Sequence, residues 1–339
     1  MIDIKYLREN PDKVKENCQN RLCPVDIDNI LILDAKRREG LTKIEELRAN
    51  RNAVSKTKPD ENQIIEMKKI GDEIQEKEKA MAKIEREYFD QLRKVPNMTH
   101  PEVKISQNEN DNPVLDSFME PTKFDFEPLD HEELGKRLDL IDLERATKVS
   151  GAKFYYLKNE LAVLEFALIQ YAMKIAMNHG YTPFSTPDLA KGTVLEELGF
   201  NPRGEATQVY NIQNSDLSLI GTAEITMGGY HMNEVISAED LPKKYVAVSH
   251  CFRTEAGSYS KYSKGIFRVH QFTKVEMFQY TMPNDSEKGH QEILEIEKEI
   301  FSGLKIPDRV VDHSTADLGT PASRTFDLEA WMPGKPNRE

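Results

Sequence analysis

Residues 245–280 of the chain read YVAVSHCFRTEAGSYSKYSKGIFRVHQFTKVEMFQY. Two runs of apolar and β-branched residues flank a loop of small residues, and this pattern predicts a long antiparallel hairpin. Alternate side chains of a strand share one face of the sheet. From Ile266 onward, we therefore expect one face to carry Arg268, His270, Phe272, Lys274, Glu276 and Phe278.

The incoming strand of this hairpin adds further charge to the same platform. Cys251, Arg253 and Glu255 fall on one face by the same alternation. A purely structural sheet usually presents scattered Lys and Glu to solvent, whereas this hairpin gathers arginines, carboxylates, a lysine and an aromatic ring. Such a platform suits a ligand with phosphates, an amine and a planar base. On pattern alone, an ordinary solvated face remains the alternative.

Composition narrows the class of protein. The 339 residues suggest two or three domains, and no apolar run approaches the roughly 20 residues of a membrane span. The amino terminus lacks a signal-peptide core, so we expect a soluble, cytoplasmic protein with no membrane partner. Cys18, Cys23 and Cys251 form no C-x-x-C pair, which indicates reduced thiols rather than disulfides or zinc. The net charge of -12 still allows a nucleic-acid partner, since binding needs only a local basic patch.

Residues 26–95 are rich in charge and show helical periodicity twice. The second stripe consists of Ile64, Met67, Ile70, Ile74, Met81, Ile84, Tyr88, Leu92 and Val95. The first stripe consists of Ile30, Leu33, Leu41, Ile44, Leu47 and Val54. Pro59 and its polar neighbours break the pattern between them. We therefore predict an antiparallel two-helix coiled-coil arm, each helix about 30 residues and ~45 Å long.

The charge of this arm is uneven. Between Lys36 and Lys58 the chain has eight basic residues against three acidic ones, an excess of five positive charges. The basic residues are Lys36, Arg37, Arg38, Lys43, Arg48, Arg51, Lys56 and Lys58. In an acidic protein this local excess is a candidate surface for a phosphate backbone. A solvated coiled-coil face explains the same pattern equally well.

The rest of the chain indicates an α+β domain. Residues 106–130 belong to a stretch rich in Pro, Asn and Asp and are predicted to be a linker, and Leu161 to Met177 predicts a core-facing helix. A short strand should end at Pro187, and a helix should run from Glu287 to Leu304. An antiparallel sheet flanked by helices fits these elements better than repeated βαβ units. Neither glycine-rich phosphate loop, G-x-x-x-x-G-K-[ST] or G-x-G-x-x-G, occurs.

Several motifs together resemble the seryl-tRNA synthetases, class II aminoacyl-tRNA synthetases, in their bacterial form. The resemblance runs from Met1 to Glu339. It rests on M-I-D-I-K-Y-L-R-E-N-P-D-K-V at the start, V-P-N-M-T-H-P after the arm, G-Y-T-P-F-S-T-P as motif 1, G-T-A-E, C-F-R-T-E-A-G with F-R-V-H-Q-F-T-K-V-E-M-F as motif 2, and F-D-L-E-A-W-M-P-G. The motif 2 match is highly specific.

This resemblance implies an organisation and an activity. It implies a tRNA-binding domain over residues 1–105 with its arm at about 26–95, a linker over 106–130, and a class II catalytic core over 131–339. The implied enzyme is a serine–tRNA ligase that uses ATP and Mg²⁺. It would activate L-serine to seryl-adenylate and transfer it to the 3′ end of tRNA(Ser). Motif 1, with its proline at Pro187, implies a homodimer.

The resemblance also assigns roles to residues of the core. Arg253 would hold the α-phosphate of ATP, where a planar guanidinium can make two hydrogen bonds. Glu255 would contact the adenine amino group, Phe272 would stack on the ring, and Thr254 would complete the ATP contacts. Arg268 would order motif 2 or reach the phosphates, so that Arg253, Glu255 and Arg268 are the implied catalytic residues. The implied serine pocket comprises Thr222, Ala223, Glu224 and Glu276.

The remaining assignments concern tRNA and metal. The implied tRNA contacts are Lys36, Arg37, Arg38, Lys43, Arg48 and Arg51. Glu339 aligns with a carboxylate that helps to bind ATP and Mg²⁺. Adenylate formation needs no side-chain base, because the serine carboxylate is itself the nucleophile, so positioning and phosphate-charge stabilisation should carry the catalysis.

The chain also departs from the family pattern. The loop after Gly257 reads S-Y-S-K-Y-S-K, where the family usually has arginine and aspartate, and only Lys261 and Lys264 keep positive charge there. The chain stops at Glu339, before the family's motif 3. We therefore expect a fragment that shows little activity by itself. Two alternatives stay open: a synthetase-derived protein that binds tRNA or another partner without aminoacylation, and a coiled-coil interaction protein with an inert sheet.

Overall fold

The computed structural model describes residues 2–55, 61–200, 208–256 and 264–334. The chain divides into two units. The first comprises Met1–Asn112 with His313–Thr325, and the second comprises Pro113–Asp312 with Phe326–Glu339. The segment between two strands of the second unit therefore belongs to the first unit. Among the described helices, none is both long and apolar enough to cross a membrane.

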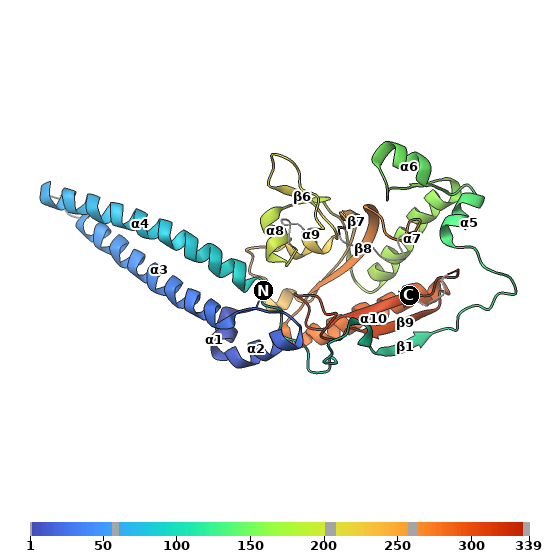
Figure 1. Ribbon diagram of the computed structural model, residues 1–339, viewed down its shortest axis with the longest axis horizontal. Coiled ribbons are helices and arrows are strands. Elements are labelled where there is room, and N and C mark those ends of the chain that lie inside the picture. Colours follow the sequence, from blue (N-terminus) through green and yellow to red (C-terminus); the bar gives the residue numbers. More distant parts are fainter. Residues whose placement is uncertain (1, 56–60, 201–207, 257–263, 335–339) are drawn as a thin grey trace. The chain divides into compact units, whose positions relative to one another are not determined.

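The first unit is helical and contains the arm. Its helices are α1 (Ile4–Glu9), α2 (Pro11–Asn20), α3 (Ile27–Ser55) and α4 (Glu61–Leu92). Figure 1 shows α3 and α4 running side by side as a long hairpin. At 1.5 Å per residue, their 29 and 32 residues give lengths of about 45 Å. The predicted two-helix arm is confirmed.

Apolar stripes hold the arm together at two levels. Near its base, a cluster packs α1 and α2 against α3 and α4. Its buried members are Ile2, Leu7, Val14, Cys18, Ile27, Ile30, Leu33, Tyr88, Leu92 and Val95. Farther along, Ile44, Ile74 and Met81 form a second cluster. At Gly40 the helices approach so closely that an added Cβ would lie 1.8 Å from the Met81 methyl carbon.

A buried arginine fastens the base of the arm to the segment His313–Thr325. Arg21 is 8% exposed, and its guanidinium donates to four carbonyl oxygens, those of Asn97, Leu318, Gly319 and Ala322. Desolvation by burial lowers the pKa of Arg21. The four carbonyl oxygens replace the water that the guanidinium loses on burial, so its donors remain hydrogen-bonded in the buried position.

The second unit mixes helices with short sheets. Its helices are α5 (His131–Arg137), α6 (Leu143–Ser150), α7 (Asn159–Asn178), α8 (Gly192–Glu197), α9 (Glu224–Gly228) and α10 (Ser286–Gly303). Its strands are β1 (Val114–Phe118), β2 (Ile141–Asp142), β3 (Tyr156–Leu157), β4 (Thr182–Ser185), β5 (Leu189–Lys191), β6 (Leu217–Leu219), β7 (Lys243–Phe252), β8 (Gln271–Tyr280), β9 (Asp308–Asp312) and β10 (Phe326–Ala330).

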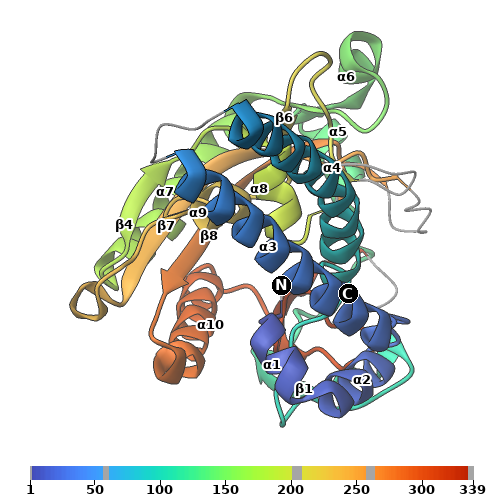
Figure 2. The same ribbon diagram turned by 90° about the vertical axis from the view of Figure 1, so that its left-hand side faces the viewer.

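Two three-stranded sheets organise this unit. One has the order β4-β7-β8, and the other has the order β1-β9-β10. Figure 2 shows β4, β7 and β8 as adjacent strands. The second sheet and the β7–β8 pair are antiparallel, as predicted, whereas β4 runs parallel to β7. Strand β1 lies within residues 106–130, so part of the predicted linker is sheet.

The helix predicted at Leu161 to Met177 is present as α7, but only part of it faces the core. Towards its carboxyl end, Ile175 and Ala176 pack with Val246 of β7 and Ile296 of α10. Towards its amino end, apolar side chains are exposed, and Val163 is 69% exposed. Helical periodicity identifies an apolar face, but it does not say whether the same chain covers that face.

Candidate active site

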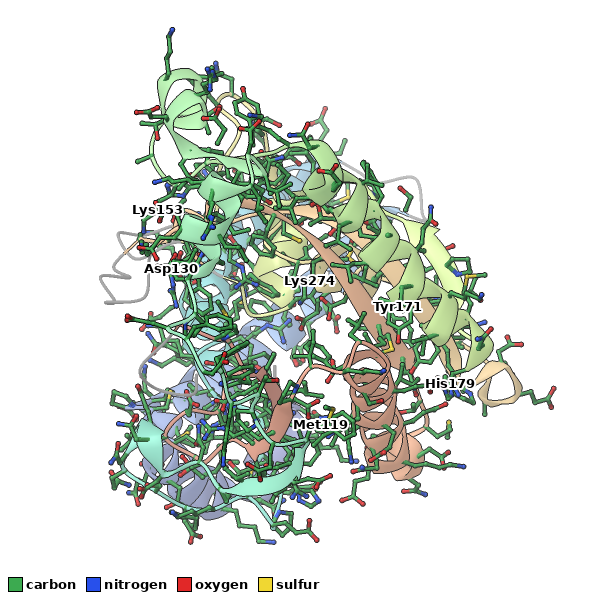
Figure 3. All side chains as sticks on the ribbon, turned by 90° about the vertical axis from the view of Figure 1, so that its right-hand side faces the viewer. Met119, Asp130, Lys153, Tyr171, His179 and Lys274 are labelled. Atoms are coloured by element: carbon green, nitrogen blue, oxygen red, sulfur yellow. The ribbon has the colours of Figure 1, made fainter. Side chains whose placement is uncertain are left out.

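The two faces of the β7–β8 hairpin have different roles. The register places Cys251 opposite Phe272, Ser249 opposite Lys274 and Ala247 opposite Glu276. On the other face, Val246, Val275 and Met277 pack against residues of α7 and α10. Figure 3 labels Lys274 on β8 and Tyr171 on α7, and Tyr171 belongs to that packed cluster. One face is thus core. On the other face, Tyr245, Ala247 and Phe278 pack with residues of and next to α9, whereas Lys274 and Glu276 make polar contacts.

The polar series predicted from Ile266 onward is only partly a strand. Strand β7 ends at Phe252 and β8 begins at Gln271, so Arg253, Glu255, Arg268 and His270 lie beyond the strands. Backbone and ring contacts still join the two ends. The Arg253 N–H donates to the His270 carbonyl at 3.1 Å, and the His270 Nδ1–H donates to the Arg253 carbonyl at 3.0 Å. His270 therefore closes the end of the hairpin.

Arg253 is held by a carbonyl and an aromatic ring. Its Nε donates to the Gly221 carbonyl at 3.2 Å, and its guanidinium carbon lies 5.3 Å from the centre of the Phe272 ring. Arginine stacks on aromatic rings and presents a planar fork of donors. Because Nε and the ring fix the plane of the group, the geometry suits two-pronged binding of a phosphate.

Glu255 and Arg268 form an ion pair next to this fork. Arg268 Nη1 lies 3.2 Å from Glu255 Oε2, and the Glu255 side chain is 11% exposed while that of Arg268 is 40% exposed. Glu255 has a positive φ of 52°, which is uncommon for a residue other than glycine. The structure therefore brings these two candidate site residues together, and within the described residues Arg268 contacts the acidic side chain of motif 2.

The face of β8 that carries Lys274 also brings together Thr222, Glu224 and Glu276. Thr222 is 2% exposed, and its hydroxyl donates to Glu276 Oε2 at 2.7 Å. The same hydroxyl accepts from the Glu224 N–H at 3.2 Å and from the Lys274 ammonium at 3.1 Å. Lys274 also forms an ion pair with Glu276. The neighbouring Ala223 is fully buried.

Two neighbouring carboxylates, those of Glu224 and Glu276, determine the electrostatics of this pocket. Burial, and after it the Glu276 carboxylate, raises the pKa of Glu224, while Lys274 and Arg253 oppose this shift. Desolvation and a nearby like charge both disfavour the ionised form. A ligand with an ammonium group would relieve this repulsion. The pocket can therefore hold an amine beside a group that accepts hydrogen bonds.

Comparisons with known proteins agree with this geometry. Residues 1–99 match the seryl-tRNA synthetase N-terminal domain, and residues 208–338 match the tRNA synthetase class II core domain (G, H, P, S and T). The serine--tRNA ligase of Treponema denticola is 47% identical over 99% of this chain and 81% of its own length. The chain belongs to the seryl-tRNA synthetase family. The serine--tRNA ligase of Dictyoglomus turgidum, at 46% identity over the same shares, supports this assignment.

Solved structures of the seryl-tRNA synthetase family match along nearly the whole chain. The Pyrococcus horikoshii seryl-tRNA synthetase complexed with ATP has a TM-score of 0.82 and 36% identity, covering 98% of this chain and 81% of that chain. The cytoplasmic serine-tRNA ligase of Naegleria fowleri in complex with AMP has a TM-score of 0.80 and 29% identity, covering 99% and 80%. The arm and the mixed-sheet unit are thus both part of a known fold.

The seryl-tRNA synthetase resemblance assigned basic residues of the arm to tRNA, and most of these residues are ion-paired. Arg37 pairs with Glu85 and Arg48 with Glu78, both on α4. Arg38 pairs with Asp34, and Lys43 with Glu39. Lys36 and Arg51 are exposed. Acidic residues of the arm therefore offset part of the local positive charge counted along α3.

Two contributors to the seryl-tRNA synthetase core had no assignment from the sequence. Lys274 lies inside the pocket, and its alternation with Phe272 and Glu276 was the available signal. Gln208 holds the segment after β7, because its carbonyl accepts from the Thr254 N–H at 3.0 Å and its side chain donates to the Ala256 carbonyl. No sequence pattern indicated Gln208. Glu339 and the loop lysine Lys261 lie outside the described residues.

Proposed function

We propose that this protein is a serine–tRNA ligase that activates L-serine with ATP and transfers the seryl group to tRNA(Ser). The observation that carries the proposal is the juxtaposition on one face of β8. The Arg253–Phe272 fork suits a nucleotide phosphate and base, and beside it the Thr222–Glu276 pocket suits a small amino acid. The ATP- and AMP-bound structures of related synthetases support nucleotide use.

The chemistry requires two transfers. In the first, a serine carboxylate oxygen attacks the α-phosphorus of ATP, and pyrophosphate leaves with the bonding electrons. In the second, a ribose hydroxyl at the 3′ end of the tRNA attacks the seryl carbonyl, and AMP leaves. Arg253 would stabilise the charge that develops on the α-phosphate, because a preorganised donor in a restricted site needs little reorganisation.

The remaining core residues support these steps by position. Glu276 would bind the serine ammonium and hydroxyl with Thr222 and Glu224, and Ala223 would form the wall of the pocket. Because a pocket that hydrogen-bonds a hydroxyl leaves polar groups unpaired when the hydroxyl is missing, alanine should be rejected strongly. Glu255 would contact the adenine amino group. Thr254 would complete the nucleotide contacts, and Arg268 would orient Glu255 through their ion pair.

The metal, the oligomer and the compartment are further parts of the proposal. Among the described residues, no group of three or more His, Cys, Asp or Glu side chains is placed to hold a metal ion. The described side chains therefore do not make a Mg²⁺ site by themselves, although Mg²⁺ commonly binds through substrate phosphates. We propose that the protein is a cytoplasmic homodimer that forms through the motif 1 region. Residues 1–105 would be the tRNA-binding domain, in which the basic residues of the arm contact tRNA.

Serine-dependent exchange of pyrophosphate into ATP tests this function. The protein expressed from its complete reading frame should catalyse exchange with L-serine and not with L-alanine or L-threonine. Arg253→Lys keeps the charge but loses the planar fork, so exchange should fall roughly 100-fold, the cost of one misplaced transition-state donor. Arg145→Lys is the matched control, since Arg145 of α6 is 77% exposed and pairs with Asp142, the residue before that helix.

Each outcome decides between candidates. Exchange with another amino acid but not with serine would overturn the substrate. Binding of tRNA without exchange with any amino acid would favour the alternative of a synthetase-derived binding protein. Unchanged exchange in Arg253→Lys would remove the fork from the mechanism.

A further inference from the structure

The Thr222 hydroxyl has no remaining capacity for a substrate. A hydroxyl has one hydrogen to donate and two lone pairs to accept. Thr222 donates to Glu276 Oε2 and accepts from the Glu224 N–H and from the Lys274 ammonium, at 2.7, 3.2 and 3.1 Å. A substrate amine that binds Thr222 and Glu276 must therefore replace one of these partners.

Lys274 is the partner that can leave. The Glu224 N–H is part of the backbone at the start of α9, whereas Lys274 is a flexible side chain that is 36% exposed. Its ammonium contacts both Thr222 Oγ1 and the Glu276 carboxylate. These are the two groups that would receive the ammonium of an amino acid. The resident lysine and the incoming substrate therefore carry the same chemical group to the same acceptors.

Electrostatics favour a direct exchange. The Glu276 side chain is only 18% exposed, and Glu224 beside it is disfavoured in its charged form. Removing the ammonium without a replacement would leave a largely desolvated carboxylate unpaired, which is costly. An amino acid brings one ammonium and one carboxylate. If Lys274 yields its place and turns to the new carboxylate, every charge stays paired.

We propose that Lys274 occupies the α-ammonium subsite in the substrate-free enzyme, exchanges places with the ammonium of the amino acid, and then binds the substrate carboxylate. This inference rests on the proposed function, because it takes L-serine as the amino acid. Lys274 is thus both a competitor for the subsite and a ligand for the carboxylate that attacks ATP. The two roles predict opposite effects on two related ligands.

The test compares L-serine with ethanolamine, which has the ammonium and the hydroxyl but lacks the carboxylate. Binding of each is measured by calorimetry to the wild-type protein and to Lys274→Met. Without the resident ammonium, ethanolamine should bind roughly three- to tenfold more tightly, the range expected for one partly exposed ion pair. L-Serine should bind more weakly by a similar factor, because its carboxylate has lost a partner. Lys288→Met, at an exposed lysine of α10, should change neither affinity.

Other outcomes contradict the exchange. Weaker binding of both ligands would show that Lys274 only braces the pocket, and unchanged binding of both would show that it takes no part. Lys274→Gln, which keeps a hydrogen-bond donor without the charge, should repeat the opposite shifts if the methionine variant folds poorly. If the wild-type protein binds no L-serine, the proposed substrate fails and the inference fails with it. Serine binding without opposite shifts overturns the inference alone.

Discussion

At the scale of single residues, the pocket face of β8 shows how a few side chains set both charge and geometry. Arg253 is oriented by the Gly221 carbonyl and by the Phe272 ring, and Glu276 shares its carboxylate with Thr222 and Lys274. The partners that orient Arg253 are thus uncharged, whereas the pocket is held together by an ion pair between Lys274 and Glu276. Changes of charge should therefore act on the pocket more than on the fork.

A second, half-buried carboxyl lies close to the pocket and leads to a prediction about pH. Glu297 of α10 lines a cavity of about 400 Å³ with Lys274, Glu276 and Asp327. Burial, then Glu276 and Asp327, raises the pKa of Glu297 from 4.5 to about 7, while Lys274 opposes the shift. The folded state binds this proton more tightly than the unfolded state does. The contribution of this proton to the free energy of unfolding is therefore complete below pH 4.5 and is lost as the pH rises through about 7.

Glu297→Gln should therefore stabilise the protein at high pH and not at low pH. At pH 8 its free energy of unfolding should exceed that of the wild-type protein by about 1–3 kcal/mol, and near pH 4.5 the difference should vanish. Denaturant unfolding at several pH values measures this. Glu295→Gln, at an exposed position of the same helix, should differ from the wild-type protein by less than about 0.5 kcal/mol throughout. A pH-independent effect of Glu297→Gln would contradict the assigned titration.

The sequence alone could predict some of these residues and not others. Strand alternation correctly grouped Phe272, Lys274 and Glu276, because period-two geometry holds wherever β8 is a strand. It failed for Arg268 and His270, since the chain leaves the strand before Gln271 and the contacts there depend on loop backbone. The Glu255–Arg268 pair involves a positive φ that no local pattern signals.

At the scale of elements, α7 has two environments along its length. Its carboxyl end is buried against β7 and α10, whereas its amino end exposes Val163 at 69% and Phe166 at 66%. Side chains three apart lie on the same side of a helix, so these two form one apolar surface. An exposed apolar surface of this kind is typical of interaction sites, and α7 directly precedes the motif 1 strand β4. This surface supports the proposed homodimer.

Val163→Glu should weaken dimerisation without unfolding the monomer. Glutamate is a good helix former, so α7 should persist, while a charge in an apolar interface should raise the dimer dissociation constant roughly 30-fold or more. Sedimentation equilibrium measures the constant, and circular dichroism checks the helix content. Val235→Glu is the matched control, because Val235 is fully exposed. An unchanged dissociation constant in Val163→Glu would place the interface elsewhere.

The elements of the arm were predictable, whereas their charge pairing was not. Apolar repeats at spacings of three and four identify α3 and α4 and the cluster of Ile44, Ile74 and Met81. The ion pairs of Arg37 with Glu85 and of Arg48 with Glu78 depend on the register between the two helices. A count of charges along α3 alone therefore overstated its positive excess.

At the scale of the whole molecule, the two units separate the residues proposed to bind tRNA from those proposed to carry the chemistry. The arm and its base belong to one unit, and the Arg253 fork and the proposed serine pocket belong to the other. The base of the arm has its own core, in which Leu7, Val14, Ile30 and Tyr88 are buried. The distal arm can therefore be removed without disturbing that core, provided that the cut is made where α3 and α4 touch.

Gly40 and Met81 mark such a place, because these residues are in direct contact across the hairpin. Replacing residues 41–81 with a short glycine–serine turn should keep the base cluster and should leave serine-dependent exchange within a factor of about three of the wild-type rate. Charging of tRNA should fall roughly 100-fold, since the proposed phosphate contacts of the arm would supply binding energy only in the second transfer. Parallel assays of exchange and of aminoacylation measure the two halves separately.

A milder variant tests whether charge is the cause. Lys43→Gln with Arg48→Gln removes two positive charges and leaves the helices intact, so tRNA binding should weaken and its dependence on the logarithm of salt concentration should become shallower by up to about 1.8, or 0.9 for each phosphate contact. Filter binding at several salt concentrations gives this slope. If the shortened arm charges tRNA at the wild-type rate, the arm has no part in the transfer. If the shortened arm loses exchange as well, the two units depend on each other, and the separation of tRNA binding from the chemistry is wrong.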